Sequence, residues 1–385
     1  MAINKLADLQ LQNKRVLIRA DLNVPLDGVT ITNDLRIRAS LPTIELALDR
    51  GAAVLIVSHL GRPKAGGDNA HLSLEPVAER LHELLECPVV LVRDWRNGLN
   101  VDPGEVKLLE NIRFEEGETK NDLELARALA SLCDVYVNDA FGTAHRAHSS
   151  THGIAKYATE SCAGILLASE IEALERALAN PKRPLVAVLG GSKISGKLEV
   201  IYNLKSVADT MLVGGGMANT LLLAAGVNVG NSLVEKELIN DAMTILQTAE
   251  VPLPVDVMTA DTIDVKSNAF LRLSDDIPSR EAIVDIGPET ARRYGKTIAG
   301  AGTVIWNGPM GIFEYPQFAE GTRKIADAVA DTDAFTLAGG GDTIAAIEQF
   351  DSSNLIDYIS TGGGAFLEFI EGKSLPGIEA LQRNS

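Results

Sequence analysis

The sequence predicts an α/β protein that is built from more than one domain. The chain has 385 residues, which is more than a single hydrophobic core usually holds. Its composition, with 46% hydrophobic and 23% charged residues, is that of a globular protein. Short, continuous apolar runs recur along the chain and alternate with helical patterns, which is typical of parallel strands that helices cover on both faces.

The predicted strands form two series. They lie at residues 16–19, 54–57, 107–109 and 135–137 in the first half, and at residues 185–188, 211–213, 304–306, 335–337 and 358–360 in the second. Between the series, apolar residues recur at three- and four-residue steps over residues 167–178, which predicts an amphipathic helix that Pro181 and Pro184 end. We expect the segment 161–184 to connect two domains, although a crossover helix within one sheet would show the same pattern.

Charge and cysteine content exclude several classes of function. The formal net charge of −17 argues against a nucleic-acid partner, because a phosphate backbone requires a basic protein face. No apolar run approaches the roughly 20 residues that span a bilayer, and the N-terminus lacks a signal-peptide pattern. We therefore expect no membrane. Cys87, Cys133 and Cys162 lie far apart and form no C-x-x-C motif, which favours a cytoplasmic location over a disulfide framework.

Almost every predicted strand is followed by a loop that is rich in glycine or in polar residues. Open α/β sheets bind ligands at the carboxyl ends of their strands, so a site is expected at these loops. In the first half, the loops and the start of the helix after the first loop carry the candidate binding residues Asp21, Leu22, Asn23, Arg36, His59, Leu60, Gly61, Arg62, Arg113 and Arg146.

The arginines of this set predict an anion pocket. A guanidinium donates two parallel hydrogen bonds to a phosphate or carboxylate, while Asp21 and Asn23 supply groups for hydroxyls. Any single arginine is more simply explained as a solvated surface residue, but repetition at strand ends favours a common site. His145, His148 and His152 lack a Cys or Glu partner at a familiar metal-ligand spacing, so we expect polar loop histidines, one or more near an anion.

In the second half, a strand runs into a motif that is close to a phosphate-binding loop. From Gly191, the sequence GSKISGKL nearly matches G-x-x-x-x-G-K-[ST]. The match fails at Leu198, which has no hydroxyl for Mg²⁺, so an ordinary P-loop NTPase is disfavoured. Lys193 and Lys197 still bring charge to a polyphosphate, and their four-residue spacing puts them on one helical face if a helix begins there.

Further glycine runs follow strands at residues 214–216, 339–341 and 362–364. A triple glycine alone is explained equally by tight strand-to-helix packing. The second run is stronger evidence for phosphate binding, because Asp342 or Thr343 can cap the helix that follows. The N-terminus of that helix would then face a phosphate. Asp342 is also the candidate ligand for Mg²⁺ carried by a nucleotide.

Together, these motifs resemble the phosphoglycerate kinase family. The resemblance covers essentially the whole chain and rests on motifs in the family's order at residues 19–25, 58–63, 108–114, 138–150, 190–198, 214–218, 306–314, 339–343 and 360–368. Two departures do not touch the chemistry. Phe366 stands where many members have Ser, and the loop 64–69 is compact, as in bacterial members.

The resemblance implies two doubly wound, Rossmann-like parallel-sheet domains joined by an interdomain helix and a hinge, in a monomer. Residues 1–170 are then the domain that binds 3-phosphoglycerate or 1,3-bisphosphoglycerate, with the tail 372–385 packing back on it. Residues 171–371 are the domain that binds Mg-ADP or Mg-ATP. The strand-end residues given above form the substrate site, and the nucleotide site comprises Lys193, Lys197, Asn307, Glu314, Gly340, Gly341, Asp342 and Thr343, with Glu314 on the ribose.

The implied reaction is phosphoryl transfer between 1,3-bisphosphoglycerate and ADP. Both nucleophiles, a nucleotide phosphate and a carboxylate, are anionic at neutral pH, so the step depends on alignment and charge neutralisation and needs no general base. We expect Arg36 and Lys197 to hold the transferring group. Mg²⁺ and backbone N–H groups would assist, the latter at Gly340, Gly341, Gly363 and Gly364. Domain closure is expected to bring the half-sites together.

Other functions remain as alternatives. Another carboxylate kinase would differ in the arginine-rich half. A non-catalytic two-domain anion-binding protein would need only one site, whereas this chain carries two dissimilar ones. A dinucleotide-dependent dehydrogenase is disfavoured, because no G-x-G-x-x-G follows a strand.

Overall fold

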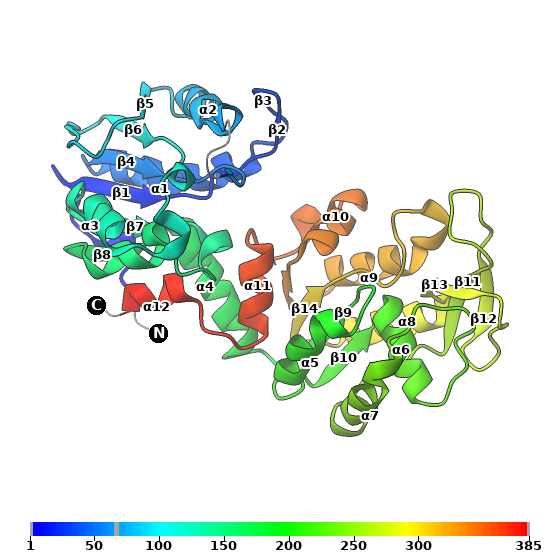
Figure 1. The fold of residues 1–385 in the computed structure, drawn as a ribbon. Helices are drawn as coiled ribbons and strands as arrows, with labels where there is room; N and C mark the ends of the chain where they lie inside the picture. Colours follow the sequence, from blue (N-terminus) through cyan, green and yellow to red (C-terminus); the bar gives the residue numbers. More distant parts are fainter. Residues whose placement is uncertain (1–2, 65–68, 383–385) are drawn as a thin grey trace. The chain divides into compact units, whose positions relative to one another are not determined.

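The computed structural model describes residues 3–64 and 69–382. The chain divides into two compact units: unit 1 comprises Met1–Glu172 and Ser374–Ser385, and unit 2 comprises Ala173–Lys373. Each unit contains a parallel sheet with helices beside it (Figure 1), which confirms the predicted α/β class with two parallel sheets. The compact loop expected at residues 64–69 lies largely outside the described residues.

Unit 1 is built on a six-stranded sheet in the order β5-β6-β4-β1-β7-β8, in which neighbouring strands are parallel. Its strands are β1 (Arg15–Arg19), β4 (Ala53–Val57), β5 (Val89–Val92), β6 (Val106–Leu109), β7 (Val135–Asn138) and β8 (Glu160–Ala163). β1 pairs with both of its neighbours so that Arg19 lies opposite Val57 and Asn138. The three central strands therefore end at the same level.

Helices and short turns surround this sheet. The α-helices are α1 (Leu35–Asp49), α2 (Glu75–Leu85), α3 (Leu123–Ser131) and α12 (Pro376–Gln382). α12, from the far end of the chain, packs beside the end of β7: Gly377 N donates to Ala144 O (2.8 Å), and Asn138 Nδ2 donates to Gly377 O (3.3 Å). A Cβ atom at Gly377 would lie 3.0 Å from Ala144 Cα, so glycine permits this close approach.

Unit 2 contains a parallel sheet in the order β10-β9-β14-β15-β16. Its strands are β9 (Leu185–Leu189), β10 (Thr210–Val213), β14 (Thr303–Asn307), β15 (Phe335–Ala338) and β16 (Tyr358–Ile359). A smaller antiparallel sheet in the order β12-β11-β13 lies at β11 (Asp256–Ala260), β12 (Phe270–Leu273) and β13 (Ala282–Ile286). This second sheet was not among the predicted strands.

The helices of unit 2 follow its strands. They are α5 (Leu198–Leu204), α6 (Gly215–Ala224), α7 (Ile239–Thr248), α8 (Pro288–Ala299), α9 (Glu320–Ala330), α10 (Gly341–Gln349) and α11 (Gly363–Ile370). The helix predicted at residues 167–178 is confirmed as α4 (Ile165–Leu178), and the two units divide within it. Among the described helices, none has the length and apolar character needed to cross a membrane.

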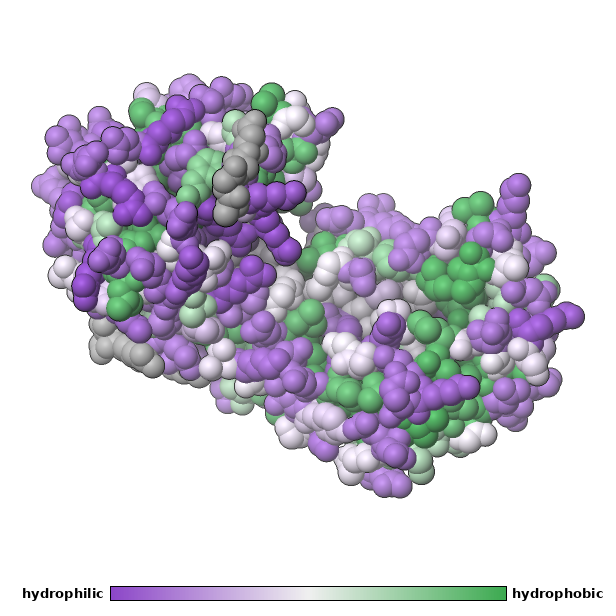
Figure 2. Space-filling view, in the orientation of Figure 1, coloured by the Kyte–Doolittle hydropathy of each residue, from purple (hydrophilic) through white to green (hydrophobic). Residues whose placement is uncertain are grey.

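Each unit has its own hydrophobic core. In unit 1, Val16, Ile18 and Val54 of the sheet pack with Ile37 and Ile44 of α1. In unit 2, strand and helix side chains pack around the fully buried Trp306 of β14. Complete burial of one such aliphatic side chain contributes roughly 1.5–3 kcal/mol. In the view of Figure 2, the face of unit 1 is largely hydrophilic, while apolar residues gather in places on the face of unit 2.

Candidate functional site

In unit 1, the loops that follow neighbouring strands are joined by hydrogen bonds. β1 and β4 end at the same level, so the segments after them leave the sheet side by side. Leu22 N donates to Ser58 Oγ (2.9 Å), and Gly61 N donates to Asn23 Oδ1 (2.8 Å). These bonds cross-link the loop after β1 to the loop after β4 and hold the predicted binding residues of both in place.

Arg36 extends from the first turn of α1 toward the loop after β1. Its NH1 group donates to Asn23 O (3.0 Å) and lies 3.4 Å from both carboxylate oxygens of Asp21. The side chain of Arg36 is 43% exposed. A guanidinium has five N–H donors. Because these contacts use a single nitrogen, Arg36 retains donors for an anionic ligand.

Arg113 is half-buried in a 3-10 helix at Ile112–Phe114, where its NH1 group donates to Gly61 O (2.5 Å). The pKa of Arg113 is lowered to about 10, first by burial and then by the nearby cations Arg19, Arg146 and Arg62. Arg113 therefore lies close to other cations without a full set of counter-ions. Arg36 and Arg113 both act on the pKa of His59, so Arg36 lies on the same side of the unit. We call Arg36, Arg62, Arg113 and Arg146 the arginine cluster, and the buried Arg19 lies beside it.

A pocket of about 700 Å³ opens on one side of this cluster. Its cationic lining residues are Arg62, Lys64, Arg113, Lys120 and Arg146. Glu115 and Glu116 also line it, so the balance of charge is positive. Such a concave basic surface suits a small phosphorylated acid.

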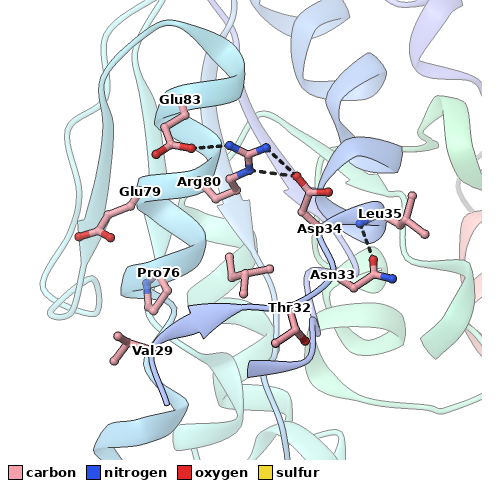
Figure 3. A pocket seen from close by; sticks show the side chains of 10 residues that line it. Val29, Thr32, Asn33, Asp34, Leu35, Pro76, Glu79, Arg80 and Glu83 are labelled. Atoms are coloured by element: carbon pink, nitrogen blue, oxygen red, sulfur yellow. Dashed lines mark hydrogen bonds and ion pairs between the residues drawn. The ribbon is translucent and has the colours of Figure 1, made fainter. Parts of the chain in front are cut away.

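Another pocket of unit 1 is lined by more negative than positive side chains. It measures about 590 Å³ and lies between the hairpin of β2 (Leu26–Asp27) and β3 (Thr30–Ile31), the start of α1, and α2 (Figure 3). Arg80 lies between Asp34 and Glu83 and is paired with both (Figure 3). Together with Glu79, these carboxylates outnumber the cation, so this pocket does not suit an anionic substrate.

Three ionisable residues outside the predicted set are buried beside the cluster: Arg19, Glu118 and His148. Arg19 NH2 lies 3.2 Å from His59 Nδ1. The pKa of His148 is lowered to about 4, by burial and then by Arg113, Arg19 and other cations. A charged residue that ends the apolar run of β1 is a sequence signal for Arg19, whereas no local pattern marks Glu118.

The remaining histidines of this segment have other partners. Arg146 Nε donates to His145 Nε2 (3.0 Å), and the Asn121 side chain bonds to His152 Nδ1 (3.1 Å). Within residues 3–64 and 69–382, no group of His, Cys, Asp and Glu side chains is arranged to hold a metal ion.

In unit 2, Lys197 and Asn307 meet at the ends of neighbouring strands. β9 and β14 pair so that Leu189 lies opposite Asn307. Lys197 Nζ donates to Asn307 O (2.8 Å) and also contacts Asn307 Oδ1. The pKa of Lys197 is lowered to about 8 by burial, which the carboxylate of Asp342 partly offsets. The Lys197 amine is thus held in a poorly hydrated place, where a polyphosphate would be a strong partner.

The loop after β15 completes this site. Asn307 Nδ2 donates to Gly339 O (2.6 Å), and Gly308 N donates to Thr343 Oγ1 (2.7 Å). Gly340 has a φ of +99°, and a Cβ atom there would lie 2.6 Å from Asn307 Nδ2. Both observations require glycine at this position.

Two helices begin together at this loop. α10 begins at Gly341 and α11 at Gly363, and a Cβ atom at Gly363 would lie 4.0 Å from Gly341 N. The first N–H groups of a helix have no partner within it and carry partial positive charge. Two such N-termini beside Lys197 form a site for phosphate oxygens. We call Lys197, Asn307, Gly340, Gly341 and Gly363 the lysine–glycine site.

The prediction that Asp342 or Thr343 caps α10 is wrong. The residue before the helix is Gly340, which has no side chain with which to cap this end. Thr343 Oγ1 instead donates to Gly339 O (2.9 Å) and accepts from Gly308 N, while Asp342 is exposed. The N-terminus of α10 therefore remains open toward a ligand.

Lys193 and Lys197 were expected to share a helical face if a helix began there, and this condition is not met. Ser195–Lys197 form a 3-10 helix, and α5 begins only at Leu198. Glu235 accepts hydrogen bonds from Ser195 N and Oγ, which holds the loop in this form. Lys193 is exposed on the loop, apart from the bonds that hold Lys197. Glu314, after β14, and Gly364, in the first turn of α11, are also exposed.

Comparison with known proteins decides the family. The model of the phosphoglycerate kinase family matches residues 6–373. The chain belongs to the phosphoglycerate kinase family. The solved structure of phosphoglycerate kinase from Coxiella burnetii is 49% identical to the chain, covers 100% of both chains and has a TM-score of 0.97. Phosphoglycerate kinase from Pyrococcus horikoshii OT3 is 35% identical, with 99% of each chain covered and a TM-score of 0.82.

Membership of the phosphoglycerate kinase family confirms the predicted reaction class. The chain is a phosphotransferase that moves a phosphoryl group between 1,3-bisphosphoglycerate and ADP, giving 3-phosphoglycerate and ATP, and it acts in glycolysis. The alternative readings, another carboxylate kinase and a non-catalytic anion-binding protein, are not favoured. The two sites described above belong to a phosphoglycerate kinase fold, and the roles of their residues are considered next.

Proposed function

We propose that the arginine cluster binds the phosphoglycerate and the lysine–glycine site binds the nucleotide phosphates. One observation carries this assignment: two cationic sites of different construction lie at strand ends, one in each unit. In unit 1, the planar guanidinium groups suit a ligand with a phosphate at one end and a carboxylate at the other. The predicted residues Asp21, Asn23 and His59 lie among them and supply groups for the hydroxyl and carboxylate.

The nucleotide site extends along unit 2. Lys197 and the N-termini of α10 and α11 face the phosphates, with Asn307 and Thr343 holding the loops that position them. Lys193 and Glu314 are exposed, so we place them at the outer phosphates and at the ribose, respectively.

The residues of this site also fit Mg²⁺ carried by the nucleotide. Asp342 has an exposed carboxylate in the first turn of α10, close enough to Lys197 to raise its pKa. Carboxylate and phosphate oxygens are the ligands that Mg²⁺ prefers. The ion, when bound, neutralises charge on the nucleotide phosphates, and Asp342 would hold it.

The chemistry of the step then falls to Arg36, Lys197 and the backbone N–H groups at Gly340, Gly341, Gly363 and Gly364. Both nucleophiles of the reversible reaction are anions, so no side chain has to remove a proton. The cationic and N–H groups align the transferring phosphoryl group and offset its negative charge, which is the main demand of phosphoryl transfer.

We also propose that the protein acts as a cytoplasmic monomer with small-molecule partners only. The net charge of −17 disfavours nucleic acid and anionic membrane surfaces. Cys87, Cys133 and Cys162 are all free thiols, as expected in a reducing compartment.

Separate binding measurements test the two assignments. Calorimetry with 3-phosphoglycerate and with Mg-ADP, each alone, should show that Arg113→Met weakens only the acid and Asn307→Ala weakens only the nucleotide. A variant of one site that weakens both ligands equally would overturn the division. ATP formation from 1,3-bisphosphoglycerate and ADP by the purified protein provides the accompanying activity test.

A further inference from the structure

A chain of buried polar groups lies behind the arginine cluster. Glu118 Oε1 accepts a hydrogen bond from Ser150 Oγ (2.6 Å), and Glu118 Oε2 accepts from Ser150 N (3.0 Å). Ser150 Oγ in turn accepts from Arg19 Nε (2.9 Å), and Arg19 NH2 lies 3.2 Å from His59 Nδ1. The exposed fractions of Glu118, Arg19 and His59 are 1%, 1% and 3%, so water does not compete for these contacts.

The donors and acceptors along this chain have one consistent arrangement. A hydroxyl has a single hydrogen, which Ser150 gives to the Glu118 carboxylate, so its lone pairs are free for Arg19. A guanidinium only donates, so His59 Nδ1 has to be the acceptor of the last contact. The proton that a neutral imidazole carries must then reside on Nε2.

The other ring nitrogen of His59 is free to act on a ligand. Among the residues that the structure describes, His59 Nε2 has no hydrogen-bond partner. The charged or titratable groups around the ring are Arg19 of β1, Arg113 of the 3-10 helix, Arg36 of α1 and His148. These groups repel a proton on His59, and burial also opposes it.

We propose that Arg19 is a positioning residue that fixes the tautomer of His59, so that His59 offers a neutral Nε2–H donor to the substrate. Glu118 and Ser150 anchor Arg19 in the orientation that this requires. The cluster thus separates two tasks: exposed arginines supply positive charge, whereas His59 supplies a hydrogen bond whose direction and charge do not change with pH.

The surrounding groups support this inference. The pKa of His59 lies well below its ordinary value because of burial and then because of Arg19, Arg113 and Arg36. Burial raises the pKa of Glu118, and Arg19, Ser150 and Arg113 oppose that rise. A buried carboxylate beside the guanidinium is the counter-ion that makes burial of Arg19 tolerable.

Nitrogen NMR of the ligand-free protein tests the tautomer directly. With ¹⁵N-labelled imidazole rings, and His59 assigned among the six histidines by His59→Gln, the wild type should show protonated Nε2 and unprotonated Nδ1 throughout pH 5–8. Arg19→Met should yield mixed tautomers and raise the pKa of His59 above that in the wild type, although burial, Arg113 and Arg36 still hold it below the ordinary histidine value. Arg19→Lys, which still donates to Nδ1, should restore the wild-type pattern.

Two further variants guard against misfolding and non-specific effects. Arg19→Met/Glu118→Gln removes both buried charges together, which avoids an unpaired carboxylate, and should give the same His59 spectrum as Arg19→Met. Arg15→Met is the matched control, because Arg15 begins the same strand and pairs with Asp134 away from the cluster. It should leave the His59 spectrum unchanged.

Binding then connects the tautomer to function. The inference rests on the proposed contact of His59 with the substrate. The affinity for 3-phosphoglycerate is therefore measured for Arg19→Met and for the wild type at each pH. The ratio of the two affinities is independent of the titration of the ligand itself. The ratio of variant to wild-type affinity should be higher at pH 5.5 than at pH 8, by up to about tenfold, in proportion to the charge that His59 of Arg19→Met gains.

The outcomes separate the two proposals. A wild-type His59 that carries its proton on Nδ1, or that titrates above pH 6, overturns the role of Arg19. An unchanged His59 spectrum in both Arg19→Met and Arg19→Met/Glu118→Gln overturns it as well. The expected spectra with a flat affinity ratio would support the role of Arg19 and instead remove His59 from the substrate site.

Discussion

Arg36 combines a fixed position with unused donors. Its NH1 group is tied to Asn23 and Asp21, while much of the side chain remains exposed. If Arg36 holds the transferring phosphoryl group, Arg36→Ala should lower kcat by roughly 10²-fold, the typical loss of one transition-state donor. Arg38→Ala is the control, because Arg38 lies on the same helix and pairs with Asp34. Steady-state kinetics in both directions provide the measurement, and a large rise in KM with normal kcat would reassign Arg36 to ground-state binding.

Lys197 should make nucleotide binding sensitive to alkaline pH. Its pKa in the folded protein is lowered to about 8, so the amine loses its charge as pH rises past that value. A polyphosphate prefers the ammonium form, and affinity for Mg-ADP should therefore fall by up to about tenfold per pH unit above pH 8. Lys197→Arg, which stays charged, should flatten the profile. Calorimetry between pH 7 and 9.5 measures the Mg-ADP affinity of the wild type and of Lys197→Arg. An equal dependence of affinity on pH in the two proteins would contradict the prediction.

At the scale of elements, two glycines at the start of α10 allow effects on stability to be distinguished from effects on nucleotide binding. Gly340→Ala should destabilise unit 2 by roughly 1–3 kcal/mol, because the φ of Gly340 is +99°, and should displace Asn307. Gly341→Ala is the matched variant: a Cβ there meets no atom within 4 Å, so thermal unfolding should change little. Its methyl group would nevertheless occupy the space assigned to phosphate. We expect Mg-ADP affinity to fall in both variants and the free energy of unfolding to fall only in Gly340→Ala. Unimpaired Mg-ADP binding by Gly341→Ala would show that the phosphates bind elsewhere.

The sequence predicts elements according to how uniformly they are buried. Strands such as β4 and β9, whose residues are all buried, were predicted because continuous apolar runs mark them. β12 was missed because its residues are mostly exposed, and β11 because it mixes Asp256 and Thr259 with apolar residues. Their pairing depends on partners distant in sequence, which no local pattern reveals.

The same contrast holds within the sites. Arg113 and Lys197 were predicted because loops at the ends of parallel strands have a known location relative to the sheet. Glu118 and Ser150 were not, since Ser150 lies 131 positions from Arg19 and 32 positions from Glu118, and no local pattern reveals such contacts. The predicted cap of α10 failed for a related reason: the Thr343 hydroxyl has a partner from another loop, Gly308 N, that competes with its own helix.

At the scale of the whole molecule, the reaction sets a geometric demand that neither unit meets alone. The arginine cluster belongs to unit 1 and the lysine–glycine site to unit 2. Transfer requires the reacting atoms to approach within about 3–3.5 Å, with water excluded from the charged groups. We therefore predict that binding of both substrates together favours an arrangement in which the two sites face one phosphoryl group.

Solution scattering tests this demand. 3-phosphoglycerate together with Mg-ADP forms a non-reacting pair, and its addition should reduce the radius of gyration more than either ligand alone. Replacing ADP by AMP, which lacks the phosphate assigned to Lys197, should weaken the effect, as should Lys197→Ala at ligand concentrations that still saturate the protein. If the radius stays constant under saturating amounts of both ligands, the two sites do not cooperate through closure, and Arg36 and Lys197 cannot act on one phosphoryl group.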